Sequence, residues 1–256
     1  MRKFLLFATG LLVLTLIACQ GQTTDARLKS GQEHLEAGEY PEAIADLESV
    51  IEADPGNAEA HLSLGQAYNH TGDLEKARDE FSTAIALDPD SASAHHNLGV
   101  TYFQLGASDA ALDEFKVALR LDPDDPDTHY QLGAVYLNRA FPEDDPMAPP
   151  DPQLVEQATA EFETALELKE GMPEALIGMA NVYMLRADYA SAIESLQQAI
   201  EQMPDSPEAY YALGGAFAQS GDVTGACEAY SHFLTLSPPP AWRDQVTQEM
   251  VALGCQ

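Results

Sequence analysis

The amino-acid sequence predicts an all-α fold made of six helical hairpins followed by one closing helix. Small residues, alanines and prolines each recur with a period of 34 residues along most of the chain. Each period holds two amphipathic stretches of about 13 residues with a short break between them, which is the pattern of two packed helices. The 256 residues leave room for six such units behind an N-terminal leader.

The first 18 residues have the features of a secretory signal peptide. Arg2 and Lys3 precede an apolar run from Phe4 to Leu16. This run is shorter than the roughly 20 apolar residues that a membrane-spanning helix needs. We therefore expect residues 1–18 to direct export and to be removed.

The end of this leader resembles the lipobox of bacterial lipoproteins. The motif is Leu16-Ile17-Ala18-Cys19, and the resemblance implies that cleavage leaves Cys19 as a lipidated N-terminus, followed by a short linker over residues 19–23. Lipid chains on one residue hold a domain at a bilayer without a spanning helix. The implied location is the periplasmic or extracellular face of the cell membrane or the outer membrane. The alternative is an ordinary signal peptide with an incidental cysteine.

The charge of the chain excludes one class of partner. Its 42 acidic side chains against 12 Lys and Arg give a formal net charge of -30. Binding to nucleic acid requires clustered basic side chains that neutralise phosphates. We therefore expect no nucleic acid among its partners.

The repeat register is set by a small residue in the first helix of each unit. Every step between these residues is 34 positions except one of 47, which locates a 13-residue insertion between the fourth and fifth of them. A glycine or alanine here lets the first helix approach the second closely. The positions are Gly31, Gly65, Gly99, Gly133, Ala180 and Gly214.

The predicted boundaries follow this register. After residue 240, Trp242, Val246, Met250 and Leu253 form one apolar stripe, so we expect a capping helix over residues 241–256 that covers the last hairpin. The hairpins are expected at 24–57, 58–91, 92–125, 126–172 with an insertion at about 141–153, 173–206 and 207–240.

These units resemble tetratricopeptide repeats (TPR). The resemblance covers residues 24–240 and is carried by runs such as His61-Leu62-Ser63-Leu64-Gly65-Gln66-Ala67-Tyr68, followed by Gly72-Asp73, Ala77, Phe81 and Leu87-Asp88-Pro89. It implies an α-solenoid of six TPR helical hairpins plus a C-terminal capping helix. Two departures are Ala180, where the family usually has glycine, and Glu170, where it has proline.

The resemblance also implies a function, namely a scaffold that mediates protein–protein interactions. In this family the first helices line a concave groove that receives a peptide. Transferred position by position, the expected groove residues are Leu62, Gln66, Asn69, His96, Val100, Phe103, Tyr130, Leu137, Asn181, Met184 and Tyr211.

The charges of the first helices narrow the expected partner. Between Ala58 and Gln219 these helices carry only Arg139 and Arg186 as bases, so the basic clamp that some family members use for acidic C-termini is missing. The expected partner is an apolar or basic segment of another protein, possibly within an envelope complex. Two alternatives stay open: a ligand- or cation-binding accessory subunit, and a structural spacer.

No catalytic motif is present in the sequence. A phosphate-binding glycine loop, an HExxH pair and a nucleophile elbow are all missing. We therefore expect neither enzymatic activity nor a cofactor.

Three histidines raise the question of a metal site. His61, His95 and His129 are spaced by 34 residues and fall on successive first helices. Packed helices lie about 8–10 Å apart, whereas zinc needs its nitrogens at about 2 Å. Packing is therefore the favoured interpretation over metal binding.

The insertion and the last two cysteines each leave two interpretations open. The proline-rich insertion predicts an extended loop, in which Glu143, Asp144 and Asp145 form either a solvated acidic stretch, which we favour, or a partner-specific or weak cation-binding element. In an exported protein, Cys227 and Cys255 suggest a disulfide. The alternative is two unlinked thiols.

Overall fold

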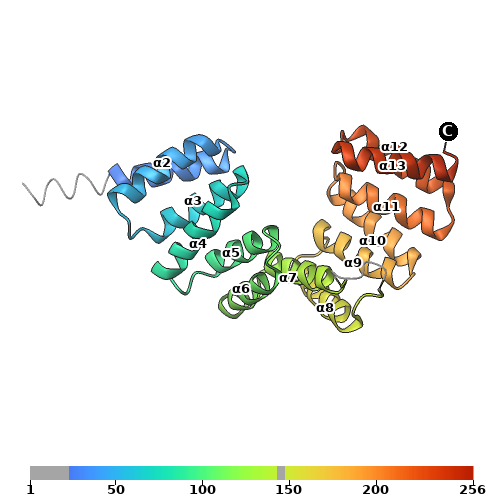
Figure 1. Ribbon diagram of the computed structural model, residues 1–256, viewed down its shortest axis with the longest axis horizontal. Coiled ribbons are helices and arrows are strands. Elements are labelled where there is room, and N and C mark those ends of the chain that lie inside the picture. The colour runs from blue at the N-terminus through green and yellow to red at the C-terminus, as the bar shows by residue number, and fades with distance from the viewer. Residues whose placement is uncertain (1–22, 143–147, 256) are drawn as a thin grey trace, which may run out of the picture. The chain divides into compact units, whose positions relative to one another are not determined.

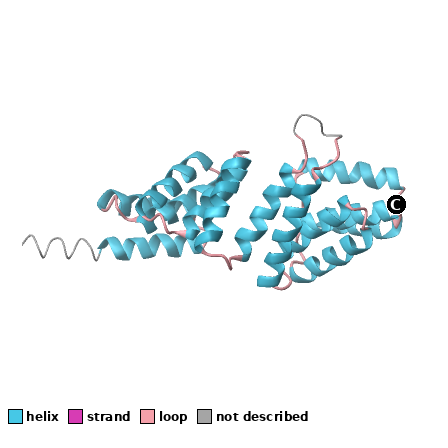
Figure 2. Ribbon diagram, turned by 90° about the horizontal axis from the view of Figure 1, so that it is seen from below, coloured by secondary structure: helices cyan, strands magenta, loops and turns pink. Residues whose placement is uncertain are grey.

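A computed structural model describes residues 23–142 and 148–255. Figure 2 shows helices joined by short loops, and no strand occurs in these residues, which confirms the all-α class. The predicted signal peptide, Cys19 and the acidic residues 143–145 of the insertion lie outside the described residues.

The chain divides into two compact units, Met1–Asp122 and Pro123–Gln256. The first begins with a helix over residues 23–36. It continues with α2 (Tyr40–Ala53), α3 (Ala58–Thr71), α4 (Leu74–Leu87), α5 (Ala92–Gln104) and α6 (Ser108–Leu121). The second unit holds α7 (Pro126–Arg139), α8 (Pro152–Leu168), α9 (Pro173–Leu185), α10 (Tyr189–Gln202), α11 (Pro207–Ser220), α12 (Val223–Thr235) and α13 (Pro240–Leu253) (Figure 1).

Within each unit, consecutive helices pack against one another. The hairpins are α3 with α4, α5 with α6, α7 with α8, α9 with α10, and α11 with α12. Neighbouring hairpins then stack, through α4 on α5 in the first unit and through α8 on α9 and α10 on α11 in the second. This succession is typical of an α-solenoid, and α13 packs on α12 as the expected closing helix.

Local sequence signals place the helix ends. Each first helix from the second to the fourth hairpin, and that of the sixth, begins after a residue whose side chain accepts a hydrogen bond from the backbone N–H three positions later. These N-caps are Asn57, Ser91, Asp125 and Ser206.

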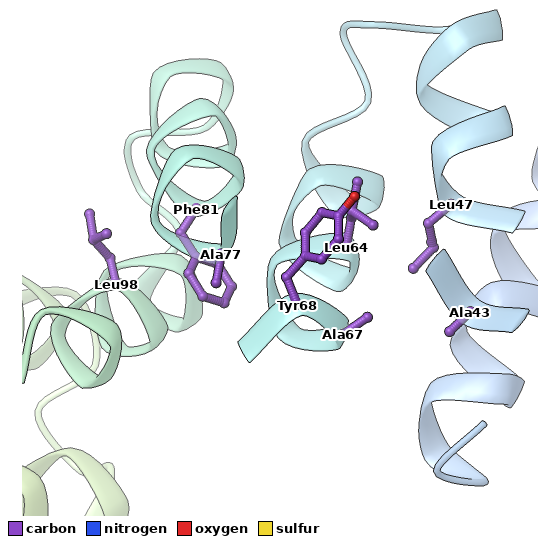
Figure 3. Close-up of a cluster of buried hydrophobic side chains, with 8 residues drawn as sticks. All are labelled: Ala43, Leu47, Leu64, Ala67, Tyr68, Ala77, Phe81 and Leu98. Carbon is purple, nitrogen blue, oxygen red and sulfur yellow. The ribbon is translucent and has the colours of Figure 1, made fainter. Parts of the chain in front are cut away.

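The core is organised by contacts between a small residue in the first helix and a large one in the second. A Cβ added at Gly65 would lie 2.6 Å from the Phe81 ring, and one at Gly99 would lie 2.7 Å from Phe115. Figure 3 shows Phe81 of α4 among the buried side chains of the first unit. The ring lies against the backbone of the first helix, so only glycine fits there. The remaining pairs are Gly31 with Leu47, Gly133 with Phe162 and Gly214 with Tyr230.

The fifth hairpin solves the same problem with different residues. Ala180 and Leu196 belong to one buried cluster and are both fully buried. A leucine can rotate its methyl groups away from an added Cβ, whereas an aromatic ring is too large and rigid to do so. The alanine in place of glycine is therefore matched by the absence of an aromatic partner.

The fifth hairpin also departs from the others at its turn. Ala187 has a φ of 56°, in the left-handed region, at the position where other hairpins have Gly38, Gly72, Gly106 and Gly221. A residue with a Cβ costs roughly 1–2 kcal/mol in this conformation. The packing of the two helices imposes the turn even though no glycine is present.

The insertion in the fourth hairpin ends where the sequence predicts a helix start. Asp151 is the N-cap of α8 and accepts a hydrogen bond from the backbone N–H of Gln153, and Pro152 is the first helical residue. The helix has 17 residues, whereas α4 has 14. Part of the inserted sequence therefore lengthens α8.

The contact between Gly99 and Phe115 gives a first prediction. The variant Gly99→Ala is expected to destabilise the first unit, because the added Cβ has no room beside the ring. Overpacking of this kind typically lowers the free energy of unfolding by about 1–3 kcal/mol. Urea unfolding followed by circular dichroism measures the loss.

The matched control adds Phe115→Leu, which copies the pairing of Ala180 with Leu196. The double variant is expected to be more stable than the sum of the two single losses implies, since the leucine makes room for the methyl group. Simple additivity of the two losses would contradict the packing argument.

Candidate functional site

A pocket of about 730 Å³ lies in the second unit, among the elements coloured from yellow to red in Figure 1. It is formed by α9, α11, α12 and α13. Three of the predicted groove residues, Asn181, Met184 and Tyr211, line it. They come from the first helices of the fifth and sixth hairpins, which contact each other directly.

The floor of this pocket rests on the hydrophobic core. Ile177 and Met184 pack against the buried cluster that contains Leu213 and Ala216 of α11. Gly215 and Ala218 also line the pocket, and their small side chains keep it open along α11. The result is a mainly apolar hollow on rigid helices.

An aromatic group forms one wall. The ring centroid of Tyr211 lies 5.6 Å from Trp242 and 5.9 Å from Phe233, and the Phe233 and Trp242 centroids lie 6.3 Å apart. Aromatic pairs at such distances contribute about 0.5–1.5 kcal/mol each beyond burial. Trp242 nevertheless remains 38% exposed and lines the pocket, so it is held in place and accessible.

A hydrogen-bond network fixes a carboxylate at the same wall. The Tyr230 hydroxyl donates to Glu249, and Gln245 Nε2 donates to Glu249 Oε1 at 3.1 Å and to the Tyr211 hydroxyl at 2.6 Å. Burial, together with the nearby charge of Glu249, raises the pKa of Tyr211 and of Tyr230. Both phenols therefore stay neutral at physiological pH, and Glu249 carries the charge.

The described lining of the pocket has one sign of charge. Glu208 and Glu249 are its ionisable carboxylates, and no Lys or Arg is among the lining residues. Because acids stand on an otherwise apolar surface, the pocket favours a ligand that is apolar, with or without a positive charge.

The other eight predicted groove residues lie on α3, α5 and α7, and several have structural contacts. Asn69 Nδ2 donates to Thr101 Oγ1 at 3.1 Å and to Gln104 Oε1 at 2.8 Å, which links α3 to α5. His96 packs edge-on against Phe115 at 5.9 Å. Leu62 packs on the core of the first unit. Gln66, Val100 and Phe103 are half-buried on the same two helices.

Tyr130 and Leu137 lie on α7 in the second unit. The Tyr130 ring lies 6.1 Å from Phe162 and packs against the buried cluster of Ala165 and Met172. Burial raises the pKa of its phenol. Leu137 is half-buried. Tyr130 is thus part of the core as well as a candidate contact residue.

The sequence analysis missed the contribution of α13 to the pocket. Trp242, Glu249, Ala252 and Leu253 line it, whereas the apolar stripe of this segment predicts only a covering role. One signal was available: the sixth hairpin has Tyr230 where the second, third and fourth have phenylalanine, and a tyrosine hydroxyl requires a polar partner.

The histidine ladder forms hydrogen bonds inside single hairpins. His61 Nδ1 lies 2.6 Å from Glu80 Oε2, and its Nε2 lies 3.2 Å from the Pro55 carbonyl oxygen. The same arrangement recurs for His95 with Glu114 and for His129 with Glu161. Across the described ranges, no group of three or more His, Cys, Asp or Glu is placed to hold a metal ion.

A disulfide between Cys227 and Cys255 ties α13 to α12. The two Cα atoms lie 5.6 Å apart, and 28 positions separate the cysteines in the sequence. Beside it, Val246 of α13 packs into the buried cluster of Ala226 and Phe233. The tether therefore holds the helix that supplies one wall of the pocket.

The fold and the pocket define a class of protein, an all-helical repeat protein with an open apolar site on its first helices. Sequence models described as tetratricopeptide repeat match residues 28–92, 80–113 and 207–240, and one described as TPR repeat matches 101–138 and 180–221. The chain belongs to the tetratricopeptide repeat family.

Solved structures share this fold. Pseudomonas aeruginosa PilF is 20% identical, with 90% of this chain and 99% of that one covered at a TM-score of 0.71. PilW, a widely conserved type IV pilus biogenesis factor, is 19% identical, with coverage of 88% and 99% and a TM-score of 0.73. YrrB, a TPR protein with an unusual peptide-binding site, is 21% identical, with coverage of 79% and 97% and a TM-score of 0.53.

These identities establish likeness of fold alone. Among curated proteins, none matches this chain. Within the residues that the structure describes, no helix combines the length and the apolar character needed to cross a membrane.

The disulfide gives a second prediction. Reduction of Cys227–Cys255 is expected to lower the stability of the second unit, because the open chain gains conformational freedom when unfolded. For a separation of 28 residues the chain-entropy relation gives about 3.5 kcal/mol. Urea unfolding with and without dithiothreitol measures the change in midpoint.

The double variant Cys227→Ser with Cys255→Ser is the control. It is expected to unfold like the reduced wild-type protein and to be insensitive to dithiothreitol. Identical midpoints for oxidised and reduced wild-type protein would show that the tether does not stabilise the fold.

Proposed function

We propose that this chain is a membrane-anchored, extracytoplasmic scaffold that binds a segment of another protein on the first helices of its hairpins. One observation carries this proposal, namely the gathering of Asn181, Met184 and Tyr211 in an open apolar pocket. Tetratricopeptide repeat proteins are generally scaffolds rather than enzymes, which agrees with a binding role and no chemistry.

The proposed partner segment is apolar or basic. The acids of the pocket, Glu208 and Glu249, have no basic neighbour in its described lining. The net charge of -30 repels acidic segments and attracts basic ones over about a Debye length. Apolar contacts in the pocket then provide affinity, and the acids provide selectivity.

The proposed location follows from the leader. Residues 1–18 would be the signal peptide, Cys19 the lipidated residue, and residues 19–23 the short connection to the repeats at 24–240. PilW is a type IV pilus biogenesis factor with a similar fold, and a role in assembling an envelope complex is the corresponding proposal for this chain.

Site-specific cross-linking tests the binding role. A photoreactive benzoylphenylalanine at Met184, inside the pocket, is expected to form a covalent adduct with one partner in the native cell. The same group at Gln197, an exposed residue of α10 outside the pocket, is the matched control. Equal labelling from both positions, or none from Met184, would contradict binding at this pocket.

Lipid labelling tests the anchor. Cells fed radiolabelled palmitate are expected to incorporate label into the wild-type protein but not into Cys19→Ala, which should also leave the membrane fraction. Cys227→Ser should keep the label, because its cysteine is not the lipidated one. Label that persists in Cys19→Ala would exclude this residue as the lipid attachment site.

A further inference from the structure

The closing helix α13 has a larger role than covering the last hairpin. Val246 is its one fully buried residue in the described part of the helix. Trp242 stays 38% exposed, although it lies beside the buried Phe233. A helix that served only as a cap would bury its tryptophan more completely. Here Trp242 instead lines the pocket together with Glu249, Ala252 and Leu253.

We propose that α13 is a working wall of the binding site, and that the pocket takes an apolar side chain flanked by lysine or arginine from a segment of another protein. This inference rests on the proposed function and specifies the site and the partner. Glu249 and Glu208 receive the positive charges, and the surfaces of α9, α11 and α13 receive the apolar side chain.

The dimensions of the pocket suit a short segment. Its lining on α11 runs from Glu208 to Gln219, which corresponds to roughly 17 Å at about 1.5 Å per helical residue. An extended chain covers that length with about five residues. Met184 and Leu253 offer flexible apolar surface, and Met side chains adapt to differently shaped ligands.

Glu249 is prepared to receive a cation. Its carboxylate accepts hydrogen bonds from the Tyr230 hydroxyl and from Gln245 Nε2. Both donors are neutral, so they orient the carboxylate without cancelling its charge. A carboxylate offers about four acceptor sites, which leaves room for an ammonium or guanidinium group. A positive side chain would therefore meet a fixed negative group.

The first measurement uses the fluorescence of Trp242, which is the only tryptophan in the chain. Three synthetic seven-residue probes share a leucine-rich centre without Trp or Tyr, and are flanked on both sides by lysine, glutamine or glutamate. Titration of the full chain is expected to shift the Trp242 emission most strongly with the lysine probe. We expect its Kd to be about tenfold below that of the glutamine probe at low salt, with a smaller difference at high salt.

Two substitutions on α13 form a matched pair. Ala252→Arg places a positive charge in the pocket, and Val251→Arg places the same charge on the neighbouring residue, which is 75% exposed and outside the lining. Ala252→Arg is expected to abolish binding of the lysine probe, whereas Val251→Arg leaves most of it. Both positions are exposed, so folding should be preserved, as circular dichroism will check.

Glu249→Gln tests the proposed cation contact. It is expected to weaken the lysine probe by about tenfold and to leave the glutamine probe unchanged. Glu208→Gln is the second variant, since Glu208 makes no contact with Tyr230 and its loss should not disturb α13. Glu228→Gln, an exposed acid of α12 outside the pocket, is the control.

The outcomes separate this inference from the proposed function. Equal affinity for all three probes, or equal effects of Ala252→Arg and Val251→Arg, would overturn the inference and leave the proposed scaffold role intact. Failure of every probe to bind would also overturn it. The scaffold role is decided independently by cross-linking from Met184.

Discussion

The whole structure depends on how closely the two helices of a hairpin approach. In most hairpins a large side chain of the second helix lies against the backbone of the first, and the first helix has glycine at that point, as at Gly65 with Phe81 and Gly99 with Phe115. This contact fixes the spacing and rotation of the pair. Because every hairpin repeats it, the 34-residue period in the sequence reflects a geometrical requirement. Ala180 with Leu196 meets the same requirement with a smaller partner.

The end of the array is where the repetition stops and the candidate site arises. A seventh hairpin would cover the sixth with another first helix, whereas α13 is a single helix tied back by the Cys227–Cys255 disulfide. Tyr230 takes the place of the aromatic core residue, and its hydroxyl reaches Glu249 on α13. The last two first helices thus keep an open apolar surface, and α13 adds an aromatic residue and a carboxylate to it.

The sequence predicted the fold more completely than the site. Hairpin order, N-caps such as Asn57 and the start of α8 after Asp151 depend on neighbours within a few residues, and such signals can be read directly. Register placed Asn181, Met184 and Tyr211 on one surface. It did not reveal that Asn69 bridges two helices, because that depends on which residue the next hairpin presents.

The sequence by itself determined the periodic features of this protein: the helices, their order, their caps and the small residues at their closest approach. Each of these is fixed by backbone conformation or by a repeat that recurs at constant spacing. Only the tertiary structure decided which first-helix residues border an open pocket, that Trp242 and Glu249 join them, and that the two cysteines meet. Those features depend on distances between residues far apart in the chain, which the packing of whole helices sets.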